Sequence, residues 1–309
     1  YFYPYGRRDV PFTYALAKDY KHQIQENKAF KYKYLFEEDK ESLELLFANV
    51  EDSTGTMESI NNYILTEQGK FRNLRNWTDF EKEVAELTKA NSNNKNEIKV
   101  VSWRKYKRII SKAIKKNDIF AKRAEENCNE IRLEEKINDI QKNDVFVVDI
   151  AKLAEDMQAF VFGDVIRRIY ELKLGQIDSD RDIDDIPSKI IIFVDELNKY
   201  ASSDVPKNSP ILKQIIDITE RGRSLGIILF SAEQFRSAIH NRVKGNCATH
   251  AYGRTNAIEI SKSDYRFVPS VYKNMMTRLE QGEYILENPV FRSLLNIKFP
   301  KPVYKQYKK

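Results

Sequence analysis

The sequence predicts an α/β fold, in which a mostly parallel sheet carries helices on both of its faces. Short runs of β-branched and aliphatic residues show no polar–apolar alternation, which is typical of strands covered on both sides. Stretches with helical spacing separate these runs, and a strand–helix–strand order favours parallel pairing under helical layers. At 309 residues, the chain is expected to form one large or two modest domains.

Composition excludes several classes of protein. Hydrophobic residues make up 41% and aromatic residues 12% of the sequence, which is enough for a packed core and excludes wholesale disorder. The longest apolar runs are far shorter than the ~20 residues of a membrane-spanning helix, so we do not expect this chain to be an integral membrane protein. Two cysteines, Cys128 and Cys247, fit a reducing compartment and predict a cytoplasmic location. The net charge of +6 permits a polyanionic partner.

The first 96 residues are expected to be mainly helical. Apolar residues spaced three and four apart over Glu41–Val50 predict an amphipathic helix. A second helix is expected to begin within Asn76–Phe80, with Thr78 or Asp79 as its N-cap. The polar stretch Asn91–Asn96 predicts a loop.

From Glu97 onward, strands and helices are expected to alternate. Glu97–Ser102 and Val145–Ile150 are rich in Val and Ile and predict strands. Glu155–Leu174 predicts a helix that ends at Gly175. Gln176–Asp185 is dominated by Asp and predicts an exposed loop.

The strongest strand prediction is Ile190–Val194, which is continuously apolar. Ser209 as N-cap and Pro210 at the first helical position predict the next helix, which ends at Gly226. A buried strand is expected directly after this glycine. The later strand candidates are residues 227–230, 251–252, 283–286 and 294–299.

Two adjacent carboxylates, Asp195 and Glu196, end the apolar run. Ligands of open α/β sheets bind beyond the carboxyl ends of the strands. One carboxylate at that place can hold Mg²⁺, usually through water, while its neighbour orients an attacking water. Any strand that leaves a core soon meets a charged residue, so the pair alone leaves a purely structural interpretation open.

Arg221 and Arg223 lie near the end of the predicted helix, and Gln234 follows the next strand. An arginine near a subunit surface can reach a neighbour's phosphates and stabilise charge in the transition state. The structural alternative for the arginines is pairing with the helix dipole. The alternative for Gln234 is an ordinary loop residue.

Three segments together resemble the HerA/FtsK group of hexameric DNA-pumping ATPases, and HerA-like ATPases in particular. They are Ile190–Glu196, Glu220–Gln234 and Asn246–Arg254. Val145–Ile150 with its following helix, and Leu279–Ile285 with Pro289-Val290, are similar to flanking segments of that group. The resemblance covers residues 140–300 well and the first 140 loosely.

The resemblance implies a RecA-like P-loop NTPase core with a helical insertion, and a role for each matching residue. Asp195 would be the Walker B carboxylate that holds Mg²⁺ through water, and Glu196 would polarise the attacking water. Gln234 would act as a sensor, and Arg223, with Arg221 as second choice, would reach into the neighbouring subunit's site. Arg254 would lie near the bound nucleotide. ATP and Mg²⁺ would be the cofactors of a ring, expected to be a hexamer.

One part of that pattern is missing from the sequence. P-loop ATPases need Gly-x-x-x-x-Gly-Lys-Ser/Thr, because backbone N–H groups must wrap the phosphates. The only Gly-Lys pair is Gly69-Lys70, which is followed by Phe71. Since the chain starts at Tyr1, we expect an upstream part with the first strand, the P-loop and a small β-barrel. A subunit that has lost nucleotide binding is the alternative.

Basic residues predict contacts with DNA phosphates in two places. Val101–Arg123 carries nine basic residues and one acidic residue, with Trp103 and Tyr106 interleaved. A solvated helix face is the alternative for this stretch. The candidates for DNA contact are Arg104, Lys105, Lys107, Arg108, Arg236, Arg242 and Lys244.

The sequence therefore predicts an ATP-driven translocase or helicase motor for double-stranded DNA. It would bind DNA without sequence specificity. The resemblance implies that it works with a nuclease or another effector, in anti-phage defence. Two rivals are an inactive ATPase-like scaffold and a metal-dependent nuclease that uses Asp195 and Glu196. The expected domains are residues 1–96, an ATPase core over 97–300 that includes the basic stretch 103–140, and a basic tail over 301–309.

Overall fold

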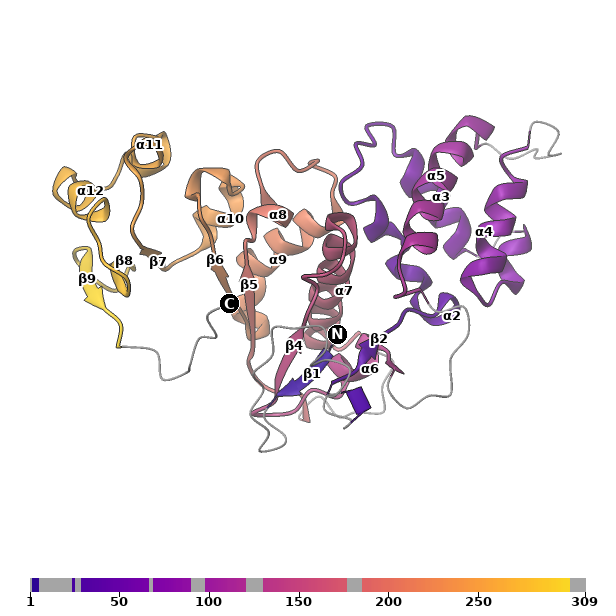
Figure 1. Ribbon diagram of the computed structural model, residues 1–309, viewed down its shortest axis with the longest axis horizontal. Helices are drawn as coiled ribbons and strands as arrows, with labels where there is room; N and C mark the ends of the chain where they lie inside the picture. The colour runs from indigo at the N-terminus through magenta and orange to yellow at the C-terminus, as the bar shows by residue number, and fades with distance from the viewer. Residues whose placement is uncertain are drawn as a thin grey trace. The chain divides into compact units, whose positions relative to one another are not determined.

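The computed structural model (Figure 1) describes residues 2–5, 24–25, 29–66, 69–89, 98–120, 130–176 and 185–300. Their contacts divide the chain into two compact units. Unit 1 comprises residues 1–192 and 205–228, and unit 2 comprises residues 193–204 and 229–309. The predicted loop at Asn91–Asn96, most of the loop at Gln176–Asp185 and the basic tail lie outside the described residues. The domain boundaries expected at residues 96 and 300 stay a prediction.

The chain is a mixed α/β protein, and its described strands form four small sheets. β1 (Phe2–Tyr5) pairs antiparallel with β4 (Val145–Val148), and β2 (Lys31–Tyr32) pairs parallel with β3 (Glu130–Ile131). β5 pairs with β6, and β7, β8 and β9 form an antiparallel sheet. The bounds of these five strands are Ile190–Asp195, Ile227–Ala232, His250–Tyr252, Glu283–Glu287 and Leu295–Lys298.

β5 and β6 run parallel, because two hydrogen bonds join them with the same sequence offset. The amide of Ile190 donates to the Gly226 carbonyl, and the amide of Glu196 donates to the Ala232 carbonyl, both at 2.9 Å. Side chains of β5 alternate between buried and exposed, and Phe193 is 76% exposed. This open face differs from the expectation of strands covered on both sides, since the described part of the chain buries only the face with Ile190, Ile192 and Val194.

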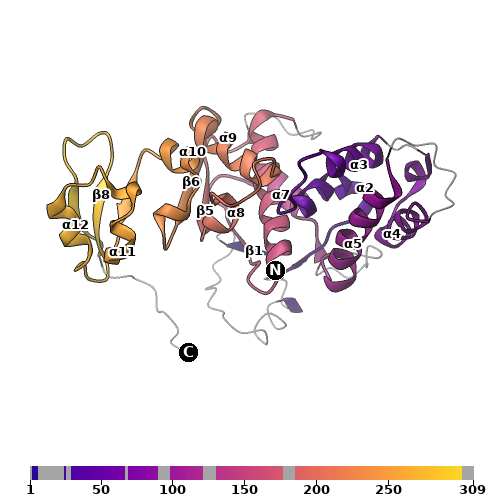
Figure 2. The same ribbon diagram turned by 90° about the horizontal axis from the view of Figure 1, so that it is seen from above.

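Helices make up most of unit 1 (Figure 2). Aromatic side chains join them: Trp77 meets Phe36 and Phe80 edge to face, and Phe47 stacks on Tyr106 at 4.7 Å between ring centroids. The helices are α2 (Phe36–Asp39), η1 (Lys40–Phe47), α3 (Thr56–Leu65), η2 (Gly69–Asn73), α4 (Trp77–Glu86), α5 (Val100–Lys116), α6 (Leu133–Asn138), α7 (Glu155–Leu174) and α9 (Pro210–Leu225).

The ends of α7 and α9 lie where the sequence predicts them. Gly175 and Gly226 cap these helices in the left-handed conformation, with φ of 68° and 73°. A Cβ on Gly226 would overlap the Ser188 carbonyl oxygen, so glycine is required there on two grounds. The Ser209 side chain accepts from the Leu212 amide, and Pro210 opens the helix.

Two predictions in this unit are wrong. Residues 100–102 of the expected strand Glu97–Ser102 belong to α5, because Trp103, Tyr106 and Ile110 recur at helical spacing and are all buried. The N-cap of α4 is Asn76, whose side chain accepts from the Asp79 amide, and neither Thr78 nor Asp79 caps it. Glu41–Val50 is helical as expected, but as the 3₁₀ helix η1 with following turns.

A buried ion-pair network ties α7 to α2 and η1. Asp164, which is fully buried, accepts from the Arg168 guanidinium at 3.0 Å and from the Ser42 hydroxyl at 2.7 Å. Arg168 also pairs with Asp39 at 2.9 Å. Burial alone would raise the pKa of Asp164, but Arg168 and Arg167 outweigh it and the pKa is lowered. The folded state therefore favours the Asp164 carboxylate, and its stabilisation is lost as the pH falls through the lowered value.

Asp164→Asn is expected to lower the free energy of unfolding by about 3 kcal/mol, because it removes the fully buried carboxylate that pairs with Arg167 and Arg168. Urea denaturation followed by tryptophan fluorescence would measure this, since Trp77 and Trp103 are both buried in unit 1. The matched control is Asp156→Asn on the same helix, whose pair with Lys112 is exposed and is expected to cost under about 1 kcal/mol. Equal losses in the two variants would contradict the prediction.

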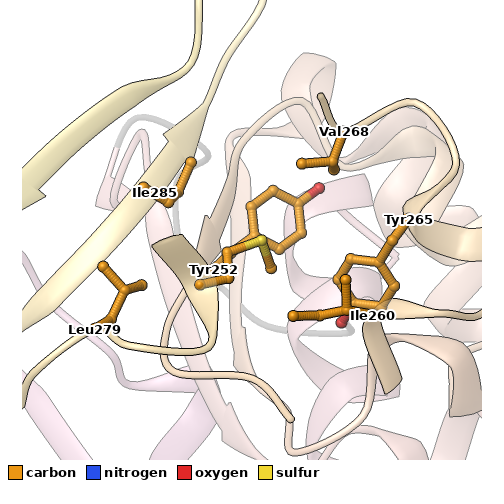
Figure 3. Packing of buried hydrophobic residues seen from close by; sticks show 7 residues of the cluster. Tyr252, Ile260, Tyr265, Val268, Leu279 and Ile285 are labelled. Atoms are coloured by element: carbon orange, nitrogen blue, oxygen red, sulfur yellow. The ribbon is translucent and has the colours of Figure 1, made fainter. Parts of the chain in front are cut away.

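Unit 2 has its own small apolar core around β7 and β8 (Figure 3). Tyr252 and Ile285 from these strands pack with Tyr265, Val268 and Leu279. The strands predicted at 251–252, 283–286 and 294–299 correspond to β7, β8 and β9. Its helices are α8 (Asn198–Ala201), η4 (Arg236–Ala238), α10 (Asn241–Asn246), α11 (Ala257–Ile260), η5 (Ser263–Tyr265) and α12 (Ser270–Met276).

Candidate active site at the ends of β5 and β6

The acidic pair lies where two neighbouring parallel strands end. Asp195 is the last residue of β5 and is exposed, and Glu196 follows it directly. The Glu196 amide donates to the carbonyl of Ala232, the last residue of β6. This edge is the place where α/β sheets bind ligands, so both carboxylates lie at a chemically useful position.

The backbone of Glu196 adopts an unusual conformation. Its φ is 55°, in the left-handed region, and Asn143 is the one other described non-glycine residue with positive φ. This conformation costs a residue with a Cβ about 1–2 kcal/mol. Strain of this kind persists only where the surroundings hold it, and it clusters at functional sites.

Two side chains hold the Glu196 carboxylate. The Lys199 ammonium lies 2.5 Å from Oε2, and the Gln234 side-chain amide donates to Oε1 at 3.3 Å. The structure therefore brings the predicted sensor, Gln234, into contact with the predicted water-polarising residue. Lys199 was missed from the sequence, although its spacing of three residues from Glu196 is a recognisable ion-pair signal.

Glu233 is a second residue that the sequence did not reveal. Its Oε2 accepts from the Asn198 amide at 3.2 Å, and the Leu197 backbone also hydrogen-bonds this carboxyl group. Burial, together with the charges of Asp195 and Glu196, raises the pKa of Glu233 to about 7. A raised pKa in a cleft or at a strand end marks candidate functional positions.

The raised pKa of Glu233 makes stability depend on pH. Because the folded state favours the proton, the stabilisation is present below the ordinary value of 4.5 and is lost as the pH rises through about 7. From about pH 5 to pH 8, wild type is expected to lose on the order of 2 kcal/mol of unfolding free energy more than Glu233→Gln. Urea denaturation followed by circular dichroism at both pH values measures the difference, and parallel losses in the two proteins would refute it.

Arg221 and Arg223, the two arginines expected to reach a neighbouring subunit's site, differ in their surroundings. Both are exposed in the last turns of α9, in unit 1. Arg221 pairs with Asp217 on the same helix at 2.9 Å. Among the described residues, the Arg223 side chain has no ion-pair or hydrogen-bond partner. An unpaired exposed guanidinium is available to a neighbouring molecule, which favours Arg223 over Arg221.

Of the remaining basic candidates of unit 2, Arg236 and Lys244 have identified partners. Arg236 donates to His250 Nδ1 at 2.8 Å and stacks over the Tyr252 and Phe267 rings, so it bridges parts of this unit. Lys244 pairs with Asp264, and Arg242 lies on α10. Arg254 lines a hollow of about 420 Å³ with Thr255, Asn256 and Thr277. Roles in DNA or nucleotide contact stay predictions for all four.

The basic face of α5 is partly engaged within unit 1. Arg104 donates to the Thr88 carbonyl and Lys105 to the Glu51 carbonyl, at 3.3 and 3.4 Å. Trp103 and Tyr106, which are interleaved among these basic residues, are fully buried and belong to the core. DNA contact by Arg104, Lys105, Lys107 and Arg108 stays a prediction.

The site can take part in binding a metal-bound nucleotide but does not form a metal cage. No group of three or more His, Cys, Asp or Glu side chains within the described residues is arranged around a metal position. Mg²⁺ is commonly held by one or two carboxylates, water and substrate phosphates, and the exposed Asp195 suits that arrangement. The same part of the chain contains no helix that is long and apolar enough to cross a bilayer.

Comparison with solved structures shows a RecA-like α/β fold. The structure of VirB4 of Thermoanaerobacter pseudethanolicus is similar to this chain, with a TM-score of 0.54 and 10% identity. The similarity covers 94% of this chain and 81% of the VirB4 chain. This likeness confirms the predicted fold class. At such identity it concerns the fold alone.

Two further structures are similar over smaller or less well superposed parts. The bacterial conjugative coupling protein TrwBdeltaN70 covers 88% of this chain and 72% of its own, with a TM-score of 0.49 and 8% identity. The genome packaging NTPase B204 from Sulfolobus turreted icosahedral virus 2, in complex with ATP-gammaS, covers 49% of this chain, with a TM-score of 0.34 and 12% identity. This chain spans 65% of the B204 chain. No protein-family model and no curated protein sequence matches this sequence.

Proposed function

We propose that this chain belongs to a HerA-type motor that uses ATP to move double-stranded DNA. Within that motor, it carries the residues that promote ATP hydrolysis. One observation carries the proposal: the acidic pair at the end of β5 is joined to Gln234 at the end of the neighbouring parallel strand. The RecA-like fold supports it. The motor would be a cytoplasmic hexameric ring that works with a nuclease or another effector in anti-phage defence.

In this proposal each residue acts through its own chemistry. Bound Mg-ATP would supply the phosphoryl group, and its Mg²⁺ would neutralise the phosphate charge. Asp195 would hold Mg²⁺ through water, and Glu196 would orient and polarise the attacking water. Gln234 senses the state of the site through its hydrogen bond to Glu196, and Arg223 reaches the site of the neighbouring subunit.

The second candidate is a scaffold that keeps the ATPase-like fold and assembles an effector without turnover. The sequence motivates it, because no glycine-rich P-loop occurs in the 309 residues. The two candidates differ in whether ATP hydrolysis is coupled to movement along DNA.

Displacement of a triplex-forming oligonucleotide from linear duplex DNA separates these candidates. The complete protein is expected to displace the third strand with Mg-ATP and not with a non-hydrolysable analogue, regardless of the duplex sequence. Its DNA affinity should fall steeply as salt rises, because contacts would be to phosphates. Binding of DNA without ATP-dependent displacement would favour the scaffold.

A further inference from the structure

The chain directly after the acidic pair makes a tight turn that leads into α8. The Lys199 amide donates to the Glu196 carbonyl at 3.0 Å, and the Glu196 amide donates to the Ala232 carbonyl. Glu196 itself is left-handed, with φ of 55°. Since glutamate does not favour this conformation, other groups must hold the turn.

Glu233 supplies such a group from the neighbouring strand. It follows β6 directly, and its Oε2 accepts from the Asn198 amide at 3.2 Å. The Leu197 backbone is a second hydrogen-bonding partner of this carboxyl group. Both amides belong to the turn that begins at Glu196, so one side chain of β6 fastens the chain that leaves β5.

We propose that Glu233 is a positioning residue, whose carboxyl group fixes the turn after Glu196 and thereby aims the Glu196 carboxylate. The structural half of this proposal stands by itself. Its catalytic half rests on the proposed function, in which Glu196 polarises water.

Glu233 and Gln234 contact different parts of the segment that begins at Glu196. Glu233 holds the amides of the turn, whereas Gln234 contacts the Glu196 carboxylate itself. Lys199, which lies within the same turn, pairs with the other carboxylate oxygen. A loosened turn would therefore displace both Glu196 and its ion-pair partner.

Burial of Glu233 supports this positioning role. Its Oε1 is enclosed and has no hydrogen-bond partner within the described part of the chain, so the hydrogen bond to the Asn198 amide is made by Oε2. Burial raises the pKa of Glu233 to about 7. Glutamine at this position keeps a carbonyl oxygen for the amides and removes the charge, so the two features can be separated.

Hydrogen exchange of the complete protein tests the structural half. Glu233→Ala is expected to speed exchange of the amides of residues 196–199 by about tenfold or more, whereas Glu233→Gln stays within about threefold of wild type. Exchange within β8, which lies in the same unit as Glu233, should be equal in all proteins and shows that this unit is intact. The matched control is Glu280→Ala, an exposed carboxylate of the same unit, which should leave these amides unchanged. Unchanged exchange in Glu233→Ala, or equal acceleration in both Glu233 variants, overturns the proposal.

Steady-state ATP hydrolysis tests the catalytic half. Glu233→Ala is expected to lower kcat about tenfold with little change in KM, and Glu233→Gln should restore most of the rate. Loosened amides with an unchanged kcat would overturn the catalytic half. If wild type itself hydrolyses no ATP, the proposed function fails, while the exchange data still decide whether Glu233 fixes the turn.

Discussion

Glu196→Gln is expected to lower ATP hydrolysis by the complete protein by about 10²–10³-fold. Glutamine keeps the size of the side chain and its hydrogen bond to Gln234, but it cannot accept a proton from the attacking water. It also loses the ion pair with Lys199. The measurement is steady-state phosphate release with saturating ATP, Mg²⁺ and duplex DNA.

ATP binding separates lost chemistry from a lost site. Affinity for ATP should stay within about threefold of wild type, because Glu196 would contact water and not the nucleotide. Glu280→Gln, an exposed carboxylate in the same unit, serves as the matched control and should hydrolyse ATP at the wild-type rate. If Glu196→Gln turned over ATP as fast as this control, Glu196 would have no part in catalysis.

The second large effect is expected at Arg223. Arg223→Ala should lower ATP hydrolysis by about 10³-fold, the contribution typical of an arginine that stabilises transition-state charge from a neighbouring subunit. Arg221→Ala removes a charge of the same kind from the same helix, but Arg221 already pairs with Asp217. We expect Arg221→Ala to lower the rate of ATP hydrolysis by less than about tenfold.

Mixing two inactive variants shows whether Arg223 acts between subunits. A ring that contains both Arg223→Ala and Glu196→Gln subunits has some interfaces with an intact glutamate on one side and an intact arginine on the other. Hydrolysis should therefore reappear on mixing. No recovery in rings shown to contain both variants would place Arg223 outside the neighbour's site, as would equal losses in the two arginine variants.

The sequence was informative where local signals and burial agree. Gly175, Gly226 and the Ser209-Pro210 pair each have a conformational requirement that a sequence reveals, so the ends of α7 and α9 could be predicted. Val100–Ser102 looked like a strand because Val favours strands. The helical spacing of the buried residues Trp103, Tyr106 and Ile110 decided otherwise.

The site could be predicted only in part. A strand that ends in Asp195 and Glu196 is visible in the sequence, whereas the left-handed backbone of Glu196 is not. Glu233 resembles any polar residue after a strand, and only pairing of β6 with β5 brings its carboxyl group to the turn. The aromatic residues among the basic residues of α5 pointed to nucleic acid, but burial places them in the core.

Phosphate release from Mg-ATP by the complete wild-type protein, with and without duplex DNA, shows whether this chain belongs to a DNA-stimulated ATPase. We expect hydrolysis that requires Mg²⁺, rises on addition of DNA of any sequence, and is lost in Glu196→Gln. If the complete protein binds no ATP, or hydrolyses it equally well after this substitution, Glu196 does not polarise water in an ATP-driven motor.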